Sequence, residues 1–412
     1  MIERPFLFDV TRMFAALWTG KGQTGIDRVC HAYLHNFGER AQAVVQHRGM
    51  FRILRPRHSD ELFALCMSGE RTSRARLARL AIKAWAQGRS HADAKGAVYF
   101  NVSHTDFDLP EHVRWVRACG LRPVYFIHDL IPITHAQYCR DRAVTRHRGR
   151  VLNALASASG IVVNSQSTAD ELTAFAEGQG LALPSLTVAP LGVGPAGRIA
   201  KPEPFNRPYF VCLGTIEGRK NHRLLLQVWL RLILQSGVKV PRLVIIGQWG
   251  DKAEAVSDMF RRHPALHQHV TLITRCDDQE ARDWIAGAEA LVMPSFAEGF
   301  GLPVIEALTI GTPVIASDLP CFRENGQGIP CLLDPRDTVA WTLVISRFSR
   351  AGGDKRRQLS LLGNFRPPLW ADHFAVVEDW LATLPEAADA MPGDAATRKP
   401  TLTPPPSRSI EA

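Results

Sequence analysis

Two glutamates, Glu298 and Glu306, flank a segment in which glycine occupies two of three positions, 299–301. The apolar residues 291–293 before it are typical of a buried parallel strand, and Pro303 after it suits the beginning of a helix. A glycine-rich loop that enters a helix presents backbone N–H groups and the positive end of the helix dipole, which together bind an anion such as a phosphate. The segment therefore predicts an anion site.

The two carboxylates are suited to a different part of a ligand. A carboxylate repels a phosphate, but it accepts hydrogen bonds from sugar and ribose hydroxyl groups. We expect Glu298 in the loop and Glu306 on the first turn of the helix. Alternatively, Glu306 only complements the helix dipole and Glu298 is a solvated loop residue. The two carboxylates together with the glycines favour a sugar nucleotide over these alternatives.

Two adjacent cations, Arg219 and Lys220, follow a second predicted strand, 209–214, which ends in Gly214. A guanidinium binds two phosphate oxygens at once, and an ammonium adds a point charge. The pair therefore suits a diphosphate, although an Arg-Lys pair in a loop is often only solvated.

Two further candidates belong to the N-terminal half. His128 and Asp129 end the predicted strand 122–127, at the edge where doubly wound α/β folds bind ligands. An isolated histidine is often structural, and its place at the strand end favours a functional role. After the first predicted strand, a loop over 19–25 ends in Gly25. A glycine there lets the backbone approach a phosphate or an acceptor, and a flexible surface loop is the alternative.

The segment 298–306, EGFGLPVIE, resembles the E-x7-E motif of retaining GT-B glycosyltransferases of the family 4 type. The segments TGIDRV (24–29), HDLIPITHAQY (128–138) and GTIEGRKNH (214–222) are similar to the corresponding segments of that family. The resemblance extends over nearly the whole chain before residue 386. It implies the GT-B fold, in which two doubly wound Rossmann-like domains face a central cleft.

The resemblance also implies roles for these residues. Arg219 and Lys220 would neutralise the leaving diphosphate of a nucleoside diphosphate sugar, without a metal or another cofactor, and His128 would lie near the reacting face of the sugar. The expected catalytic residues are Arg219, Lys220, Glu298 and His128, and the expected donor-binding residues are Gly25, Gly214, Gly299, Phe300, Gly301, Leu302 and Glu306. Asp106 and Asp108 spell the Asp-x-Asp pattern of metal-dependent transferases, which we interpret as a chance match in a loop.

Predicted strands alternate with predicted helices in both halves of the chain, as in doubly wound α/β domains. We expect an acceptor-side domain at 1–195 and a nucleotide-sugar-binding domain at 196–385. The last helix, at about 370–384, should pack back on the first domain. Residues 386–412 lack aromatic side chains and are rich in Ala, Pro, Asp and Thr, which predicts a disordered tail.

The composition narrows the possible partners. The chain has 412 residues and a formal net charge of +9, which favours phosphorylated substrates, anionic lipids or nucleic acid. No nucleic-acid-binding motif is present, so we do not expect that partner. The eight cysteines form no C-x-x-C pair, which indicates reduced thiols and no metal site. Without a secretory signal or a run of ~20 apolar residues, the sequence predicts a cytoplasmic protein.

One basic segment allows two interpretations. Residues 69–89 carry six Arg or Lys residues, and Leu77, Leu80, Ala81, Ala84 and Trp85 can share one helical face. Such a helix could lie on an anionic membrane, as a peripheral contact with the inner face of the cytoplasmic membrane. It could equally be a solvated helix that packs through its apolar stripe.

The motif set looks most like mannosyltransferases of bacterial capsule, O-antigen or exopolysaccharide assembly. That resemblance implies GDP-mannose as donor and a polyprenyl-diphosphate-linked saccharide as acceptor. A glucosyl or rhamnosyl donor is the alternative. Two alternative functions are a catalytically silent scaffold that binds a sugar nucleotide and a sugar-nucleotide epimerase. The intact Arg219, Lys220, Glu298 and Glu306 argue against the scaffold, and the E-x7-E loop argues against the epimerase.

Overall fold

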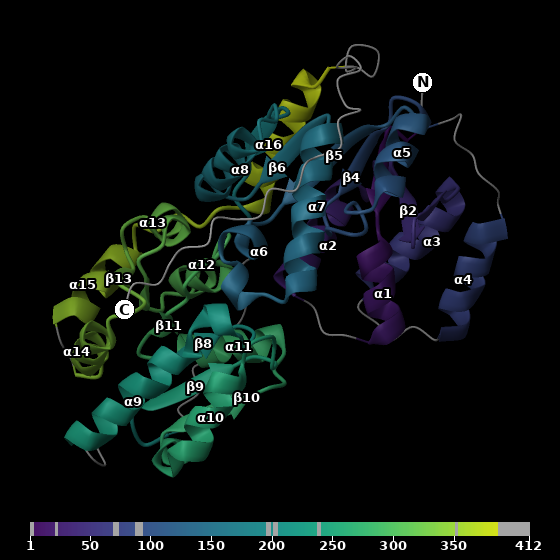
Figure 1. Cartoon of the computed structure of the whole chain (residues 1–412). Helices are drawn as coiled ribbons and strands as arrows, with labels where there is room; N and C mark the ends of the chain where they lie inside the picture. The colour runs from purple at the N-terminus through teal and green to yellow at the C-terminus, as the bar shows by residue number, and fades with distance from the viewer. Residues whose placement is uncertain are drawn as a thin grey trace.

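Two parallel β-sheets, each covered by helices, form the molecule (Figure 1). The computed structural model describes residues 4–20, 24–68, 74–86, 94–194, 199–200, 205–236, 240–350 and 353–385, with only the backbone at 84 and 85. Strand order is β3-β2-β1-β4-β5-β6-β7 in the first sheet and β10-β9-β8-β11-β12-β13 in the second. The two doubly wound α/β domains expected from the alternation of strands and helices are confirmed.

The first sheet is parallel except for the edge strand β3, which runs antiparallel to β2. Central strands β4 and β6 are buried at every residue, as expected for strands covered by helices on both faces. The strands are β1 (Phe6–Asp9), β2 (Ala41–His47), β3 (Met50–Ile53), β4 (Val98–Asn101), β5 (Arg122–Ile127), β6 (Gly160–Val163) and β7 (Leu186–Val188). The helices are α1 (Thr11–Thr19), α2 (Gly25–Phe37), α3 (Pro56–Met67), α4 (Arg74–Ala86), α5 (Pro110–Ala118), α6 (Ile131–Thr134), α7 (Asp141–Ser157) and α8 (Gln166–Gly178).

The second sheet is parallel throughout its described strands. Its strands are β8 (Tyr209–Leu213), β9 (Arg242–Ile246), β10 (Val270–Ile273), β11 (Leu291–Met293), β12 (Val314–Ser317) and β13 (Cys331–Leu333). Its helices are α9 (His222–Ser236), α10 (Glu254–Arg262), α11 (Asp278–Ala286), α12 (Leu302–Thr309), α13 (Pro320–Gly326), α14 (Thr338–Phe348) and α15 (Gly353–Leu362).

The last helix, α16 (Trp370–Thr383), packs on the first sheet. His373 on α16 binds the carbonyl of Ala189 and the hydroxyl of Tyr33, and Figure 1 shows α16 beside α8 and β6. Just before α16, the amide of Val193 donates to the carbonyl of Pro368 at 3.0 Å. The two passages of the chain between the sheets therefore lie side by side.

We propose 1–195 and 196–385 as the limits of the two domains, with α16 returning to the first. These limits place each sheet within one domain. The segment 386–412, for which the sequence predicts a disordered tail, lies outside the described residues.

The domains meet at the carboxyl ends of their strands. Ser165, at the start of α8, donates its hydroxyl to the carbonyl of Gly299 at 2.9 Å. Glu324 on α13 accepts hydrogen bonds from the amides of Gln166 and Ser167, at the N-terminus of α8. These contacts hold the glycine-rich loop of one domain against the other.

Candidate active site

The glycine-rich loop between β11 and α12 lies directly against the first domain. A Cβ on Gly299 would lie 2.3 Å from the carbonyl oxygen of His128, so only glycine fits at this position. Gly301 is the residue before α12 and has a φ of +88°, a left-handed conformation that favours glycine. The loop therefore brings the helix N-terminus to the carboxyl end of β5.

Glu306 was expected on the first turn of the helix but lies on its second turn. Because Gly301 precedes the helix, α12 begins at Leu302, and Pro303 is its second residue. Glu306 is then the fifth residue and lies on the second turn. Helix-dipole complementation, the alternative considered for this carboxylate, acts within the first turn and is weakened by this position.

Glu298 lies between the two predicted cations and is buried. One of its oxygens accepts from Lys220 Nζ at 2.5 Å, and the other accepts from Arg219 Nη1 at 3.0 Å. Burial alone would raise the pKa of Glu298, but the charges of Lys220 and Arg219 outweigh it and lower the pKa to about 2. Glu298 is therefore ionised at neutral pH.

The contact of Glu298 with both cations was not part of the sequence prediction, which assigned Glu298 to sugar hydroxyls and the cations to the diphosphate. The physical reason is burial, because a carboxylate removed from water needs charged or polar partners. Arg219 also pairs with Glu217 through Nε at 2.8 Å. The positions of both cations are thus fixed by carboxylates, and a solvated pair is excluded for the buried Lys220.

Gly214 follows β8 and lies against Lys220. A Cβ there would make ordinary van der Waals contact with Lys220 Cε at 3.4 Å and Nζ at 3.5 Å. The φ of +144° is what favours glycine at this position, because side chains rarely adopt it.

Glu306 joins the domains through Arg28, on α2. The Nη1 atom of Arg28 lies 2.5 Å from Glu306 Oε1, and its Nη2 atom lies 2.7 Å from Asp278 Oδ1. Burial raises the pKa of Glu306, against the opposing charge of Arg28. Arg28, Asp278 and Glu306 border a cavity of about 390 Å³ that also adjoins Gly192 and Trp370. The cavity is large enough for part of a nucleotide.

His128 follows β5, and its side chain is only 6% exposed. Its Nε2 lies 2.8 Å from the carbonyl oxygen of Val102, which can only accept, so Nε2 carries the proton. Burial lowers the pKa of His128 to about 4, although the hydrogen bond to Val102 opposes this shift. The ring is therefore neutral at pH 7, with Nδ1 free of a proton and able to accept.

Two histidines that the sequence analysis did not single out surround His128. The ring of His104 lies 4.9 Å from that of His128, and the ring of His147 lies 5.4 Å from that of His104. Each places Nε2 2.9 Å from a backbone carbonyl, of Phe126 and Asp129 respectively. Burial lowers the pKa of both. No spacing in the sequence signals this cluster, because its members come from three separate segments.

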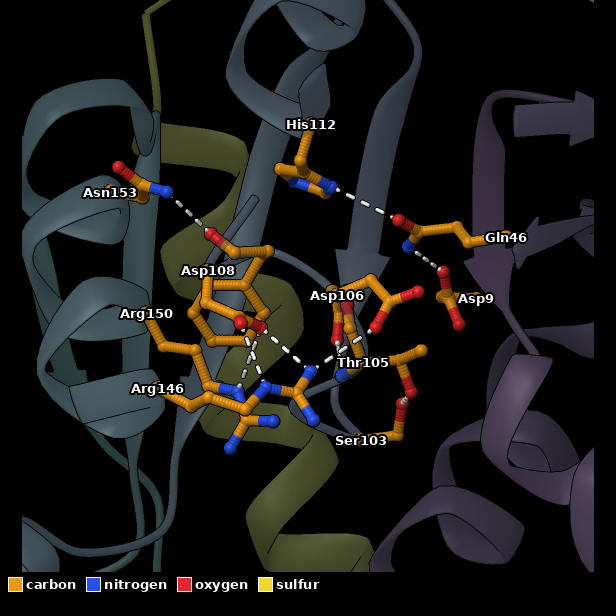
Figure 2. A network of polar contacts seen from close by, with 12 residues as sticks. Asp9, Gln46, Ser103, Thr105, Asp106, Asp108, His112, Arg146, Arg150 and Asn153 are labelled. Atoms are coloured by element: carbon orange, nitrogen blue, oxygen red, sulfur yellow. Dashed lines mark hydrogen bonds and ion pairs between the residues drawn. The ribbon is translucent and has the colours of Figure 1, made fainter. Parts of the chain in front are cut away.

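The Asp-x-Asp pattern forms a structural ion-pair network (Figure 2). Arg146 lies 3.3 Å from Asp106 and 2.8 Å from Asp108, and Arg150 lies 3.5 Å from Asp108. The figure also shows the buried Asp9 bound to Gln46, which contacts His112 at 3.3 Å. In the described part of the chain, no cluster of three or more His, Cys, Asp or Glu residues could hold a metal ion.

The remaining predicted residues lie along the loop and the facing helix α2. A Cβ on Gly25 would lie 3.7 Å from Leu302 Cδ1, so these two residues lie in contact where the domains meet. The side chain of Phe300 is buried in the core, which leaves only its backbone for a ligand. The structure brings Arg219, Lys220 and Glu298 together, and it places His128 beside Gly299.

Residues 207–350 match the family described as glycosyl transferases group 1. This segment is a group 1 glycosyltransferase domain. It contains the cation pair, both glutamates and the glycine-rich loop described above.

The group 1 glycosyltransferase domain also has curated relatives. The chain is 29% identical over 242 residues to the serotype-specific mannosyltransferase WbdA of Escherichia coli, which covers 55% of this chain and 29% of that protein. It is 31% identical over 132 residues to the O-antigen chain mannosyltransferase B of Escherichia coli, covering 32% and 34%. The chain thus spans about a third of the length of these relatives.

The fold is that of the GT-B glycosyltransferases. The Anabaena protein Alr3699/HepE, solved with UDP-glucose, superposes with a TM-score of 0.63 at 15% identity, covering 92% of this chain and 99% of that one. The likeness covers both sheets and confirms the predicted GT-B architecture. Within the described residues, no helix has the length and apolarity needed to cross a membrane.

Proposed function

We propose that this protein is a retaining, metal-independent glycosyltransferase of the family 4 type. In this proposal it transfers mannose from GDP-mannose to a polyprenyl-diphosphate-linked saccharide in O-antigen, capsule or exopolysaccharide synthesis. The observation that carries the proposal is the Arg219–Glu298–Lys220 cluster beside the N-terminus of α12, in which Lys220 and the Glu298 side chain are buried and Arg219 is partly exposed. Two fixed cations and a helix N-terminus suit a leaving diphosphate.

Each residue has a role in this proposal. Arg219 and Lys220 stabilise the departing diphosphate, and Glu298 positions them. The amides of Gly299, Phe300 and Gly301 bind the donor, whose ribose hydroxyls bind Glu306. His128 accepts a hydrogen bond from a sugar hydroxyl through Nδ1, because Nε2 is already used by Val102. The diphosphate itself serves as base for the acceptor hydroxyl.

The choice of mannose and of a polysaccharide acceptor rests on the relatives. WbdA and the O-antigen chain mannosyltransferase B both carry mannosyltransferase in their names. The family match over residues 207–350 includes both glutamates and both cations. We extend the same reaction class to this protein.

A thermal-shift experiment tests the donor site. GDP-, UDP-, ADP- and dTDP-sugars are added to the full chain with EDTA present. A ligand at ~100 times its Kd stabilises the folded state by about 2.7 kcal/mol, so GDP-mannose should raise the Tm. The shift should disappear in Lys220→Ala and in Glu306→Ala.

The control is Lys95→Ala, which removes an exposed lysine of the N-terminal domain. It should keep the full shift. A shift that survives in Lys220→Ala, or that requires a divalent metal, would contradict the proposed site. Stereochemistry is tested by NMR of the product, in which the new linkage should keep the α configuration of the donor.

We also propose that α4 contacts an anionic membrane surface. Its exposed cations Arg74, Arg76, Arg79 and Lys83 are unopposed by acidic residues on the same helix. Each basic residue near such a surface contributes about 1 kcal/mol. Reversing the charges of Arg74, Arg76 and Arg79 should abolish co-flotation with phosphatidylglycerol vesicles, and unchanged flotation would refute the contact.

A further inference from the structure

An apolar pocket of about 500 Å³ lies in the N-terminal domain, away from the donor site. We call it the α1–α4 pocket, because α1 and α4 supply its principal lining side chains. These are Phe14, Ala15 and Trp18 of α1, and Leu80, Ala81 and Ile82 of α4. Its volume falls within the range of roughly 300–1,000 Å³ that is usual for small-ligand sites. Figure 1 shows α4 at the outer side of this domain, beyond α1 and α3.

Two large apolar side chains at this pocket are accessible to water. Ile82 is 67% exposed and Trp18 is 40% exposed. The ring of Trp18 lies 6.3 Å from that of Phe14, so the aromatic surface continues from the exposed residue into the pocket. Exposed apolar surface that is continuous with a concave apolar lining is typical of a binding site.

The charges around the pocket indicate what kind of ligand it takes. Arg74, Arg76, Arg79 and Lys83 are exposed on α4, and residues 74–86 contain no acidic residue. An apolar cavity lined by the helix that carries these cations matches an amphiphile that has a hydrocarbon chain and an anionic head. A neutral hydrophobic ligand would gain nothing from these cations.

Helix α1 contacts both the pocket and α2. Thr11 lines the pocket, and the next residue, Arg12, pairs with Asp27 of α2 at 2.6 Å. The first residue of α2, Gly25, approaches Leu302 at the donor loop.

We propose that the α1–α4 pocket binds the isoprene units nearest the diphosphate of the polyprenyl-linked acceptor, while the cations of α4 attract that diphosphate. This inference rests on the proposed function, since it names where the acceptor lipid of that reaction lies. It assigns a role to the basic segment 74–86 beyond general attraction to a membrane.

The test measures how affinity depends on chain length at a constant head group. Isopentenyl, geranyl and farnesyl diphosphates are titrated into the full chain by calorimetry. Affinity should rise at least tenfold from the five-carbon to the fifteen-carbon ligand, because each buried CH₂ contributes ~0.8 kcal/mol, about a fourfold change. Ala81→Phe fills the pocket and should abolish the rise.

Two further variants keep the test interpretable. Ala75→Phe adds the same ring at an exposed position of α4 outside the pocket lining, and should keep the wild-type dependence. Ile82→Lys changes an exposed residue without disturbing the core, and should reduce the rise. The same affinity for all three ligands in the wild-type chain would overturn the proposal, as would an undiminished rise in Ala81→Phe.

Two more measurements separate this proposal from its alternatives. If Ala81→Phe loses phosphatidylglycerol vesicle binding but keeps the prenyl chain-length dependence, the pocket takes membrane acyl chains and the proposal fails. Nucleotide-sugar thermal shifts in the same variants report on the donor site alone. A lost donor shift with a retained chain-length dependence contradicts the proposed function and leaves the lipid site supported.

Discussion

At the residue scale, the central feature is a buried carboxylate shared by two cations. Glu298 lies within 3.0 Å of both Lys220 and Arg219, and it also accepts from the hydroxyl of Ser295 at 2.7 Å. Removing one member of a buried ion pair leaves an uncompensated charge and is costly, typically about 3–5 kcal/mol. The cluster therefore contributes to stability as well as to the proposed chemistry.

A double-mutant cycle measures this coupling. Lys220→Met and Glu298→Gln should each lower the free energy of unfolding by roughly 3 kcal/mol. The double variant should lose at least ~1 kcal/mol less than the sum, because neither residue then leaves its partner unpaired. The measurement is urea unfolding.

A second lysine–glutamate pair provides the matched control. Lys355 and Glu289 pair in the same domain, but their side chains are 24% and 25% exposed. Lys355→Met should cost only about 0–1 kcal/mol. Additive losses in the Lys220–Glu298 cycle would show that burial does not couple these two charges.

The histidine cluster predicts that stability falls in acid. The pKa values of His104, His128 and His147 are all lowered by burial, that of His128 to about 4. Below pH ~6.5 the unfolded chain therefore binds more protons than the folded one, and the free energy of unfolding falls as the pH decreases toward 4. His128 contributes up to about 1.4 kcal/mol per pH unit in that window, and His104 and His147 act in the same direction.

Urea unfolding at pH 7.5 and pH 5.0 checks this dependence. The buried Asp9 acts in the opposite direction, because burial raises its pKa to about 6 and its ionisation destabilises the fold as the pH rises. Burial also raises the pKa values of Glu171 and Glu306, which act in the same direction as Asp9. Burial lowers the pKa values of His112, His222 and His373 as well, so the buried histidines outnumber these acids and the chain should be less stable at pH 5.0. His147→Asn should reduce the difference, and equal stability at the two pH values would refute the account.

At the element scale, the sequence predicts helices and strands best where glycine and proline residues mark their ends. The strand, the glycine loop, the helix and the next strand over 291–317 are all present, since Gly301 and Gly311 mark both ends of α12. The helix that follows β1 was not predicted. Residues 11–19 form α1, which the sequence analysis did not identify, because no glycine or proline marks its beginning and it is only nine residues long.

The candidate site shows the same limit. The sequence predicted that Arg219, Lys220 and His128 follow the ends of strands. Such residues are candidates for a site, because parallel strands end at one edge of their sheet, where these folds bind ligands. The contact of Glu298 with both cations was not predicted, since it depends on side-chain burial between β8 and β11. The Arg28–Glu306 pair joins residues 278 positions apart, and no local pattern encodes it.

Substitutions of the two glycines at the ends of α12 distinguish the cost of backbone strain from the cost of a steric clash. Gly301 and Gly311 both have positive φ, but a Cβ on Gly301 would lie 2.4 Å from the Phe322 ring, whereas nothing lies within 4 Å of one on Gly311. Gly311→Ala should cost about 1 kcal/mol, and Gly301→Ala roughly 2–4 kcal/mol because overpacking adds to strain. Urea unfolding gives both values, and equal losses would exclude the clash.

At the scale of the whole molecule, contacts between the domains couple α8 to the donor loop. Glu324 binds two amides at the N-terminus of α8, and Ser165 beside them binds Gly299. Losing such a cap typically costs about 1 kcal/mol. The arrangement of the two domains seen here, in which these contacts form, then becomes less stable by about 1 kcal/mol relative to one in which they are broken.

Glu324→Ala should therefore weaken donor binding about fivefold, the equivalent of ~1 kcal/mol, while leaving the circular dichroism spectrum unchanged. Calorimetric titration with the nucleotide sugar measures the change. Asp318→Ala is the control, because Asp318 pairs with Arg323 within the same domain. Equal effects of the two substitutions would show that the contact between domains does not assist donor binding.

The paired passages of the chain at Val193 and Pro368 determine how the cleft can open. The two domains are joined by connecting segments that lie side by side and are hydrogen-bonded to each other, so a rotation of one domain relative to the other has its hinge there. Residues near the hinge move least during such a rotation. Arg28 and Glu306 border the same cavity as Val193 and Trp370, so they lie beside the hinge. A ribose held at Glu306 would keep its place through each opening of the cleft, and the acceptor side could exchange substrate and product while the nucleoside stays bound.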